Sequence, residues 1–88
     1  MPSTLSLLER ALTVKSMPEW TDTLHVHRNA LRNAKAAGHL TPVLAGNLAI
    51  ELNEDPTPWM ALAVIEGEKD SPAKQRLAKR LASAIRNL

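Results

Sequence analysis

Apolar residues recur at helical spacing along the chain, in short segments separated by polar breaks. Leu5, Leu8 and Leu12 follow one another every three to four residues, which is the spacing of one face of an amphipathic helix. Further sets at similar spacing follow, and no segment shows the strict alternation of a half-buried strand. The pattern predicts an all-α protein, a compact bundle of five to six short helices.

Capping residues mark where these helices are expected to begin. Ser16 and Glu19 stand at capping-box spacing with Pro18 between them, so a short helix is expected from about Met17 to Leu24. The same cap-plus-proline signal occurs at three later places: Thr41-Pro42, Asp55-Pro56 and Ser71-Pro72. Near the N-terminus, Ser3 or Thr4 is expected to begin the first helix, and Gly38 is expected to follow the end of the third.

The composition agrees with helices and excludes several chemistries. Trp20 and Trp59 are the only aromatic residues, and a core of Leu, Ala, Val, Ile and Met suits helices better than sheets. With 88 residues, the chain has room for a single domain, residues 1–88. The absence of cysteine excludes a disulfide framework, a thiolate zinc site and a cysteine nucleophile.

The longest apolar run is Trp59–Ile65, which is apolar on every side of the expected helix. Such a helix is expected to lie in the core, with part of its surface in a subunit contact. The run is far shorter than the roughly 20 residues that span a membrane, and the first residues lack the basic start and apolar stretch of a signal peptide. We therefore expect a cytoplasmic protein without a membrane partner.

Charge is distributed in blocks. Residues 24–40 carry three cations and no acid, residues 41–70 carry six acids and one lysine, and residues 71–88 carry five cations and no acid. Two interpretations are open at this point: basic faces for a polyanion, or solvated helix surfaces.

The most informative segment is residues 17–35, which read as a short helix, a three-residue turn and a second helix of residues 28–36. On a helical wheel of this second helix, Ala30, Leu31 and Ala34 share the inner side. The outer side carries three cations and two amides, namely Arg28, Asn29, Arg32, Asn33 and Lys35. These side chains are typical of major-groove recognition, because arginine pairs with guanine, asparagine with adenine and lysine with phosphate.

In this segment the chain resembles the lambda-repressor-like (Cro/CI-type) helix-turn-helix proteins of phages and mobile elements. The apolar positions of that family's motif are matched by Trp20, Leu24, Val26, Leu31 and Ala34. The family usually has alanine where this chain has Thr21 and a turn glycine where it has His25. That turn position needs a positive φ, which histidine adopts more readily than most residues.

The resemblance implies a sequence-specific transcriptional regulator, a repressor for instance, that binds double-stranded operator DNA. The residues expected to contact DNA are His27, Arg28, Asn29, Arg32, Asn33 and Lys35. Of these, Arg28, Asn29, Arg32 and Asn33 are expected to read bases, whereas His27, Lys35 and Thr23 are expected to hold phosphates. A homodimer is expected, because one recognition helix makes few contacts and a two-fold axis doubles them.

The last helix, about residues 72–87, is a candidate for dimerisation through its stripe of Leu77, Leu81, Ile85 and Leu88. Its cations have two interpretations, an added contact with the DNA backbone or a solubilising surface, and the second is preferred because nothing in the sequence places this helix next to the helix-turn-helix segment. The alternative function is a small helical interaction module, an antirepressor or adaptor, that binds another protein through its apolar helices.

The sequence contains no residue pattern typical of a metal site or of an enzyme active site. His25, His27 and His39 have no cysteine or acidic cluster beside them, so no metal site is expected. No catalytic triad or glycine-rich phosphate loop is visible, so we expect neither an enzyme, a cofactor nor a small-molecule substrate. The acids Glu51, Glu54 and Asp55 are interpreted as a polar turn and helix start rather than a carboxylate site.

Overall fold

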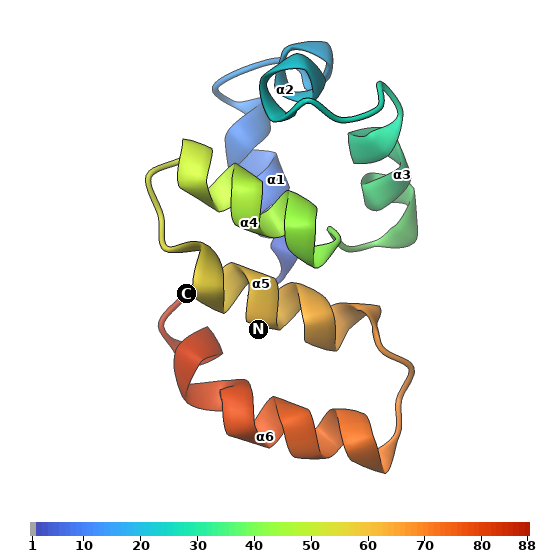
Figure 1. Ribbon diagram of the computed structural model, residues 1–88, viewed down its shortest axis with the longest axis vertical. Coiled ribbons are helices and arrows are strands. Elements are labelled where there is room, and N and C mark those ends of the chain that lie inside the picture. The colour runs from blue at the N-terminus through green and yellow to red at the C-terminus, as the bar shows by residue number, and fades with distance from the viewer. Residues whose placement is uncertain (1) are drawn as a thin grey trace.

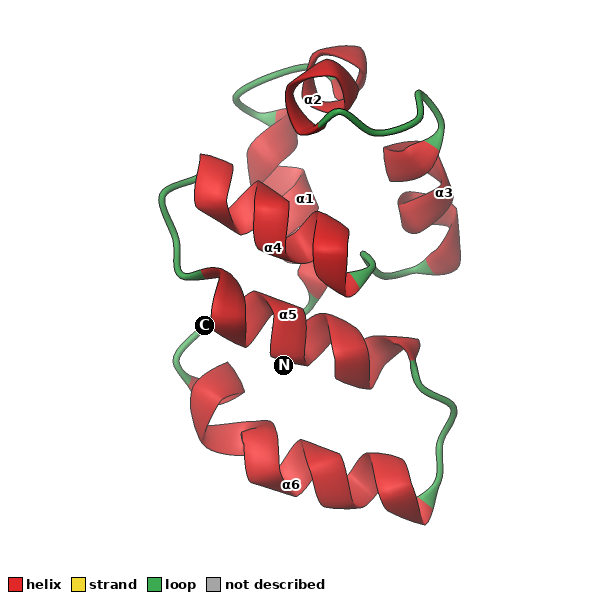
Figure 2. Ribbon diagram, in the orientation of Figure 1, coloured by secondary structure: helices red, strands yellow, loops and turns green. Residues whose placement is uncertain are grey.

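Most of the helices begin at the capping residues that the sequence predicts. In the computed structural model, which describes residues 2–88, α1 spans Thr4–Leu12, α2 Met17–Leu24, α3 Ala30–Ala37, α4 Pro42–Glu51, α5 Pro56–Gly67 and α6 Pro72–Arg86. Residues 2–88 contain these six helices and no strand, so the predicted all-α class is confirmed (Figures 1 and 2).

Side-chain hydrogen bonds explain four of these helix starts. The Ser16 hydroxyl accepts from the Glu19 N–H while the Glu19 carboxylate accepts from the Ser16 N–H, which completes the predicted capping box. The side chains of Thr41, Asp55 and Ser71 cap α4, α5 and α6 with one hydrogen bond each, accepted from a backbone N–H of the first turn, and each of these helices has a proline in that turn.

Helix α1 begins differently from the prediction. Ser3 stands at the N-cap position but its side chain makes no capping hydrogen bond. Instead the Glu66 carboxylate, from the far end of α5, accepts from the backbone N–H and the hydroxyl of Thr4. The Leu40 N–H donates to the same hydroxyl at 2.8 Å, so the buried Thr4 joins α1, α5 and the segment before α4.

The core lies between the first five helices. It consists of Leu7, Leu8, Ala11, Trp20, Leu31, Ala34, Leu40, Leu44, Ala45, Leu48, Ala49, Trp59, Leu62 and Ala63. Helix α4 packs against α1 on one side and α5 on the other, and α5 packs in turn against α6. The indole N–H of Trp20 donates to the Ala11 carbonyl at 2.6 Å and so ties α2 to α1.

Helix α5 lies in the core, as the apolar run predicts, but it is not covered on every side. Trp59, Leu62 and Ala63 are buried, whereas Met60 and Val64 are exposed to solvent. The reason is that the contacts of α5 with α4, α6 and α1 leave part of its surface uncovered.

The molecule is elongated, with principal dimensions of 38 × 24 × 19 Å. Helices α2 and α3 occupy one end of the long axis and α6 occupies the other (Figure 1). Within residues 2–88, no helix combines the length and the apolar character needed to cross a membrane.

Candidate nucleic-acid interface

The turn after α2 is built on a histidine in the left-handed conformation. His25 has φ 55° and ψ 46° and forms the C-cap of α2. Its N–H donates to the Asp22 carbonyl, and the Val26 N–H donates to the Thr21 carbonyl at 3.1 Å. The expected positive φ at His25 is therefore confirmed. Glycine adopts this backbone conformation without a steric penalty, whereas here a histidine adopts it.

Helix α3 begins at Ala30, two residues later than predicted, and the turn before it comprises residues 25–29 rather than three residues. The physical reason is a local hydrogen-bonded turn. The Asn29 N–H donates to Nδ1 of His27 at 3.1 Å, and the Ala30 N–H donates to the His27 carbonyl at 2.9 Å. Arg28 and Asn29 consequently belong to the turn, with Asn29 at the N-cap position of α3.

The inner face of α3 is the predicted one and fixes the helix to the core. Leu31 is 0% exposed and Ala34 is 6% exposed, while Ala30 is half-buried and packs against the same cluster. Because protein interiors are close-packed, this contact gives α3 a defined position. Side chains on its outer face therefore project from a rigid support.

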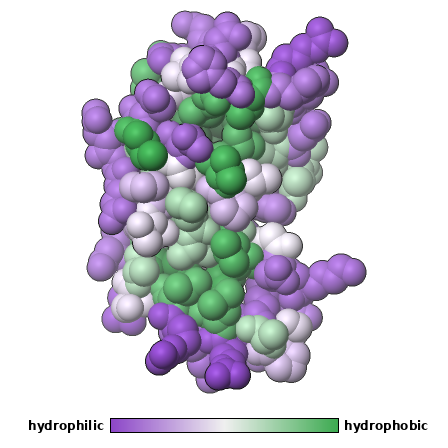
Figure 3. Space-filling model, in the orientation of Figure 1, coloured by the Kyte–Doolittle hydropathy of each residue, from purple (hydrophilic) through white to green (hydrophobic). Residues whose placement is uncertain are grey.

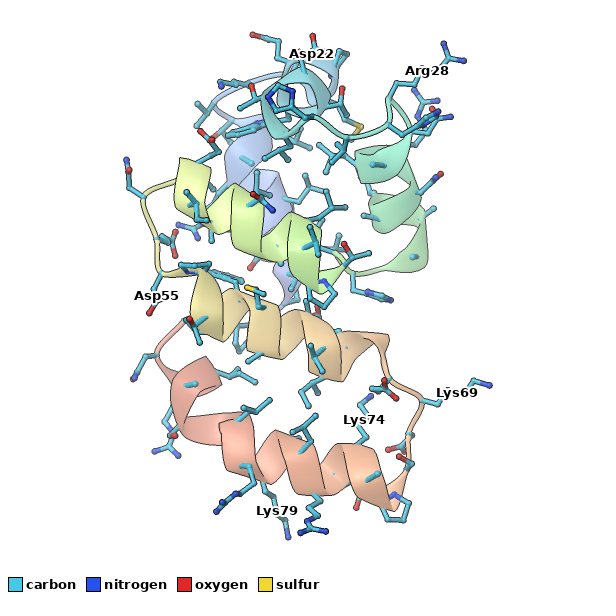
Figure 4. The ribbon with its side chains drawn as sticks, in the orientation of Figure 1. Asp22, Arg28, Asp55, Lys69, Lys74 and Lys79 are labelled. Atoms are coloured by element: carbon cyan, nitrogen blue, oxygen red, sulfur yellow. The ribbon has the colours of Figure 1, made fainter. Side chains whose placement is uncertain are left out.

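Three of the predicted DNA-binding residues are brought together. Arg28, Asn29 and Arg32 line one open hollow with Pro18 and Thr21 of α2. The two arginines are exposed and Asn29 is half-buried. Figure 4 shows Arg28 extending outward from this end of the molecule.

Sequence reasoning did not assign Pro18 and Thr21 to the surface of the site. Both lie on α2, and the Thr21 hydroxyl donates to the Pro18 carbonyl at 2.8 Å. Their spacing of three residues places them on one side of α2, and this spacing is the signal by which they could have been found.

The other predicted residues take different places. Asn33 is exposed on the outer face of α3, one residue beyond Arg32. Lys35 is also exposed but lies on the flank of the helix next to α1, in a small hollow with Leu8 and Leu12. It does not line the hollow that contains Arg28, Asn29 and Arg32.

Thr23, expected to hold phosphate, is already engaged. Its hydroxyl donates to the Glu19 carbonyl at 2.9 Å and accepts from the Lys15 ammonium at 3.0 Å. That ammonium also lies 4.8 Å from the centre of the Trp20 ring, in cation–π geometry. Lys15 is thus a cation beside α2 that the sequence analysis did not single out.

The cations of the site are not neutralised by acids of the chain. Across residues 2–88, the single ion pair joins Arg10 and Glu54, far from α3. The nearby Glu19 is committed to the capping box, and the Ser16 hydroxyl, then the Ser16 backbone N–H, hold the pKa of its carboxyl below the ordinary value. The arginines and Lys35 are therefore available for an external anion.

The acids between α4 and α5 serve the fold, in agreement with their interpretation as a polar turn and helix start. Glu54 accepts from the indole N–H of Trp59 at 3.0 Å, and the Arg10 guanidinium with which it pairs lies 5.8 Å from the centre of the Trp59 ring. Asp55 caps α5 by accepting from the Thr57 N–H. Among the described residues, no group of three or more His, Asp or Glu side chains is placed to hold a metal ion.

The candidate interface combines a rigid helix with side chains that can pair with nucleic acid. A helix fixed by its apolar side presents two guanidinium groups and two amides, beginning in the turn that precedes it. Such groups can form paired hydrogen bonds with base edges and single ones with phosphates. No known family model matches the chain, and neither the curated proteins nor the solved structures include a significant match.

Proposed function

We propose that this chain is a sequence-specific DNA-binding regulator that inserts α3, with the turn before it, into the major groove of an operator. The observation that carries the proposal is the gathering of Arg28, Asn29 and Arg32 around one hollow, at the start of a helix fixed to the core. In helix-turn-helix complexes, the first residues of the second helix contact base edges. Occupation of an operator near a promoter would then regulate transcription.

Each residue has a role that follows from its chemistry. Arg28 and Arg32 pair with O6 and N7 of guanine through their planar guanidinium groups. Asn29 and Asn33 pair with N6 and N7 of adenine, since their amides offer one donor and one acceptor. These four residues account for sequence preference.

Phosphate contacts are assigned to the two predicted residues at the margins of the site. His27 uses Nδ1 to accept from the Asn29 N–H, so the neutral ring carries its proton on Nε2 and can donate it outward. Lys35, on the α1 flank of α3, suits the backbone of the strand beside the groove.

A homodimer completes the proposal, because a single α3 offers few base contacts. Two copies related by a two-fold axis would read half-sites about one helical turn apart. The stripe expected to form the dimer contact is largely used within the molecule, since Ile85 and Leu88 pack against the core. We assign the contact instead to the apolar side chains that α4, α5 and α6 leave exposed, which are Val43, Ile50, Met60, Val64 and Leu77.

The test is selection of bound sequences from a random duplex pool at two salt concentrations. The wild-type protein is expected to enrich a palindromic motif, and Arg28→Ala/Arg32→Ala is expected to enrich none. The matched control is Arg76→Ala/Arg86→Ala, which removes the same charge from α6 and should retain the motif. Loss of the motif in both variants, or in neither, would contradict the assignment to α3.

A second candidate function is supported by the same exposed apolar side chains. Val43 and Ile50 of α4 are 68% and 56% exposed, and Figure 3 shows apolar surface over α4 and along the seam between α5 and α6. An apolar surface of this kind suits binding to another protein. Under this alternative no DNA motif is enriched, and Val43→Lys/Ile50→Lys weakens an association that added salt leaves unchanged.

A further inference from the structure

The outer side of α6 carries four exposed cations. We call this surface the α6 basic face and define it as Arg76, Lys79, Arg80 and Arg86, all of which are exposed. At 100° per residue the four side chains fall within an arc of about 120°. Residues 72–88 contain no acid, and the ion pair between Arg10 and Glu54, the single one among residues 2–88, lies elsewhere.

The α6 basic face is held in place by the opposite side of its helix. Leu81, Ile85 and Leu88 are half-buried on the side that packs against α5. The Ser71 hydroxyl accepts from the Lys74 N–H at 3.1 Å, which caps the helix where it begins. The cations therefore project from an ordered helix even though α6 has no fully buried residue.

This face and the α3 site lie at opposite ends of the molecule. The long axis measures 38 Å, with α3 near one end and α6 at the other (Figure 1). In Figure 4, Arg28 extends outward at the α3 end, whereas Lys79 extends away from the body at the α6 end. A straight duplex bound to α3 therefore leaves the α6 basic face uncovered and directed away from it.

We propose that the α6 basic face binds the phosphate backbone of a second DNA duplex, so that one molecule bridges two duplexes. The proposal rests on the proposed function for α3. The side chains of the α6 basic face are all cations and none is an amide. This composition suits contact with phosphates rather than base reading. From Arg76 to Arg86 the helix extends about 15 Å, a length over which duplex DNA carries about nine phosphate charges.

An anionic membrane fits this surface less well. Helices that bind at a lipid interface bury an apolar side in the acyl boundary beneath their cations. Here the apolar side of α6 faces α5, and between Arg76 and Arg86 the outward arc consists of cations and Ser83. Association with anionic vesicles in place of bridging is accordingly an outcome that overturns the proposal.

The test is a bridging assay with the whole protein. A duplex that carries the selected motif is attached to beads, and a labelled duplex of unrelated sequence is offered in solution with increasing protein. The wild type is expected to retain labelled duplex at least tenfold above background. Arg76→Gln/Lys79→Gln/Arg80→Gln is expected to retain only background while still binding the motif.

Two controls separate charge from structure. Arg76→Lys/Arg80→Lys/Arg86→Lys keeps the charge and is expected to bridge as the wild type does, because phosphate contact requires charge rather than a planar fork. The glutamine variant should keep its helical circular dichroism, and the slope of log affinity against log salt for the unrelated duplex should fall by roughly two to three.

The outcomes also distinguish this proposal from the proposed function. If the glutamine variant bridges as well as the wild type, the α6 basic face is not the second site and the two α3 helices of a dimer account for bridging. If the motif is selected through α3 but the wild type never bridges, this inference alone fails. If duplex DNA binds through α6 while no α3-dependent motif exists, both the proposed function and bridging are overturned.

Discussion

Helices α3 and α6 both present cations to solvent, but they are built in different ways. Helix α3 has eight residues, rests on the buried Leu31 and Ala34, and displays amides beside its guanidinium groups. Helix α6 has fifteen residues, contains no fully buried side chain, and displays cations without amides on its outer arc. The difference indicates that α3 suits base reading, which requires accurately placed mixed donors and acceptors, whereas α6 suits contact with a uniform charge.

The two helices are also held in place by different contacts. The position of α3 depends on the core between α1, α2 and α4, because its anchors belong to that cluster. The position of α6 depends on partly exposed contacts with α5. Substitutions should therefore affect the two regions unequally.

The largest expected effect is the loss of Trp20. Trp20→Ala removes a 1%-exposed side chain that fills the core and donates to Ala11, so we expect the free energy of unfolding to fall by about 3–5 kcal/mol. Chemical denaturation measures this change. Leu77→Ala in α6 is the comparison and should cost less than about 1 kcal/mol, since Leu77 is already 39% exposed. Equal losses in the two variants would remove the distinction between the regions.

The next effect concerns the guanidinium fork. Arg32→Lys keeps the charge but loses bidentate pairing, so it should cost about 1–3 kcal/mol of discrimination at one base pair of the motif. Binding to the selected duplex and to single-base variants of it measures the discrimination. Arg80→Lys in α6 should leave the base preference unchanged. A motif that is unaffected by Arg32→Lys would place base reading outside α3.

A smaller effect is expected at the turn that positions α3. His25→Ile places a β-branched residue at φ 55° and should lower the free energy of unfolding by about 1–2 kcal/mol. His25→Gly should be neutral or raise it by up to about 1 kcal/mol, because glycine adopts this conformation without a steric penalty. Thermal or urea unfolding measures both changes, and a glycine variant less stable than the isoleucine variant would exclude conformational strain as the cause.

The smallest effect is the pH dependence of the α2 capping box. Hydrogen bonding by Ser16 lowers the pKa of the Glu19 carboxyl in the folded protein. Its contribution to stability is therefore complete above the ordinary glutamate pKa of the unfolded chain and is lost as the pH falls through the lower folded value. Carboxyl chemical shifts during a pH titration measure the folded pKa. In Ser16→Ala the hydroxyl is lost while the backbone N–H at this position remains, so the midpoint should rise toward the ordinary value without reaching it. An unchanged midpoint would show that the Ser16 hydroxyl is not the main cause.

Local signals in the sequence predicted much of the fold, and one of them was misread. The caps at Ser16, Thr41 and Ser71 were predictable, because each depends on residues at most three positions apart. The start of α3 was misplaced because the turn made by the His27 ring and the Asn29 N–H has no standard pattern in the sequence.

The candidate site was predictable in its residues but not in its grouping. The wheel of residues 28–36 placed Lys35 with Arg32, whereas in the structure Lys35 lines a hollow with Leu8 and Leu12 of α1 and Arg32 lines the hollow with Arg28 and Asn29. The hollow also includes Pro18 and Thr21, which come from a different helix. A wheel describes a single helix and contains no information on what a neighbouring helix contributes.

The helical class and most capping residues follow from interactions between residues a few positions apart, so they can be predicted from the sequence, and the resemblance to the helix-turn-helix family implied the positive φ at His25. The hydrogen bonds of Thr4 to Glu66, 62 positions away, and to Leu40, 36 positions away, exist only because the packed helices bring these residues together. The placement of the α3 site and the α6 basic face at opposite ends of the molecule also depends on the tertiary structure. It follows from how α4 and α5 pack between them, and that packing arises from contacts between helices distant in sequence.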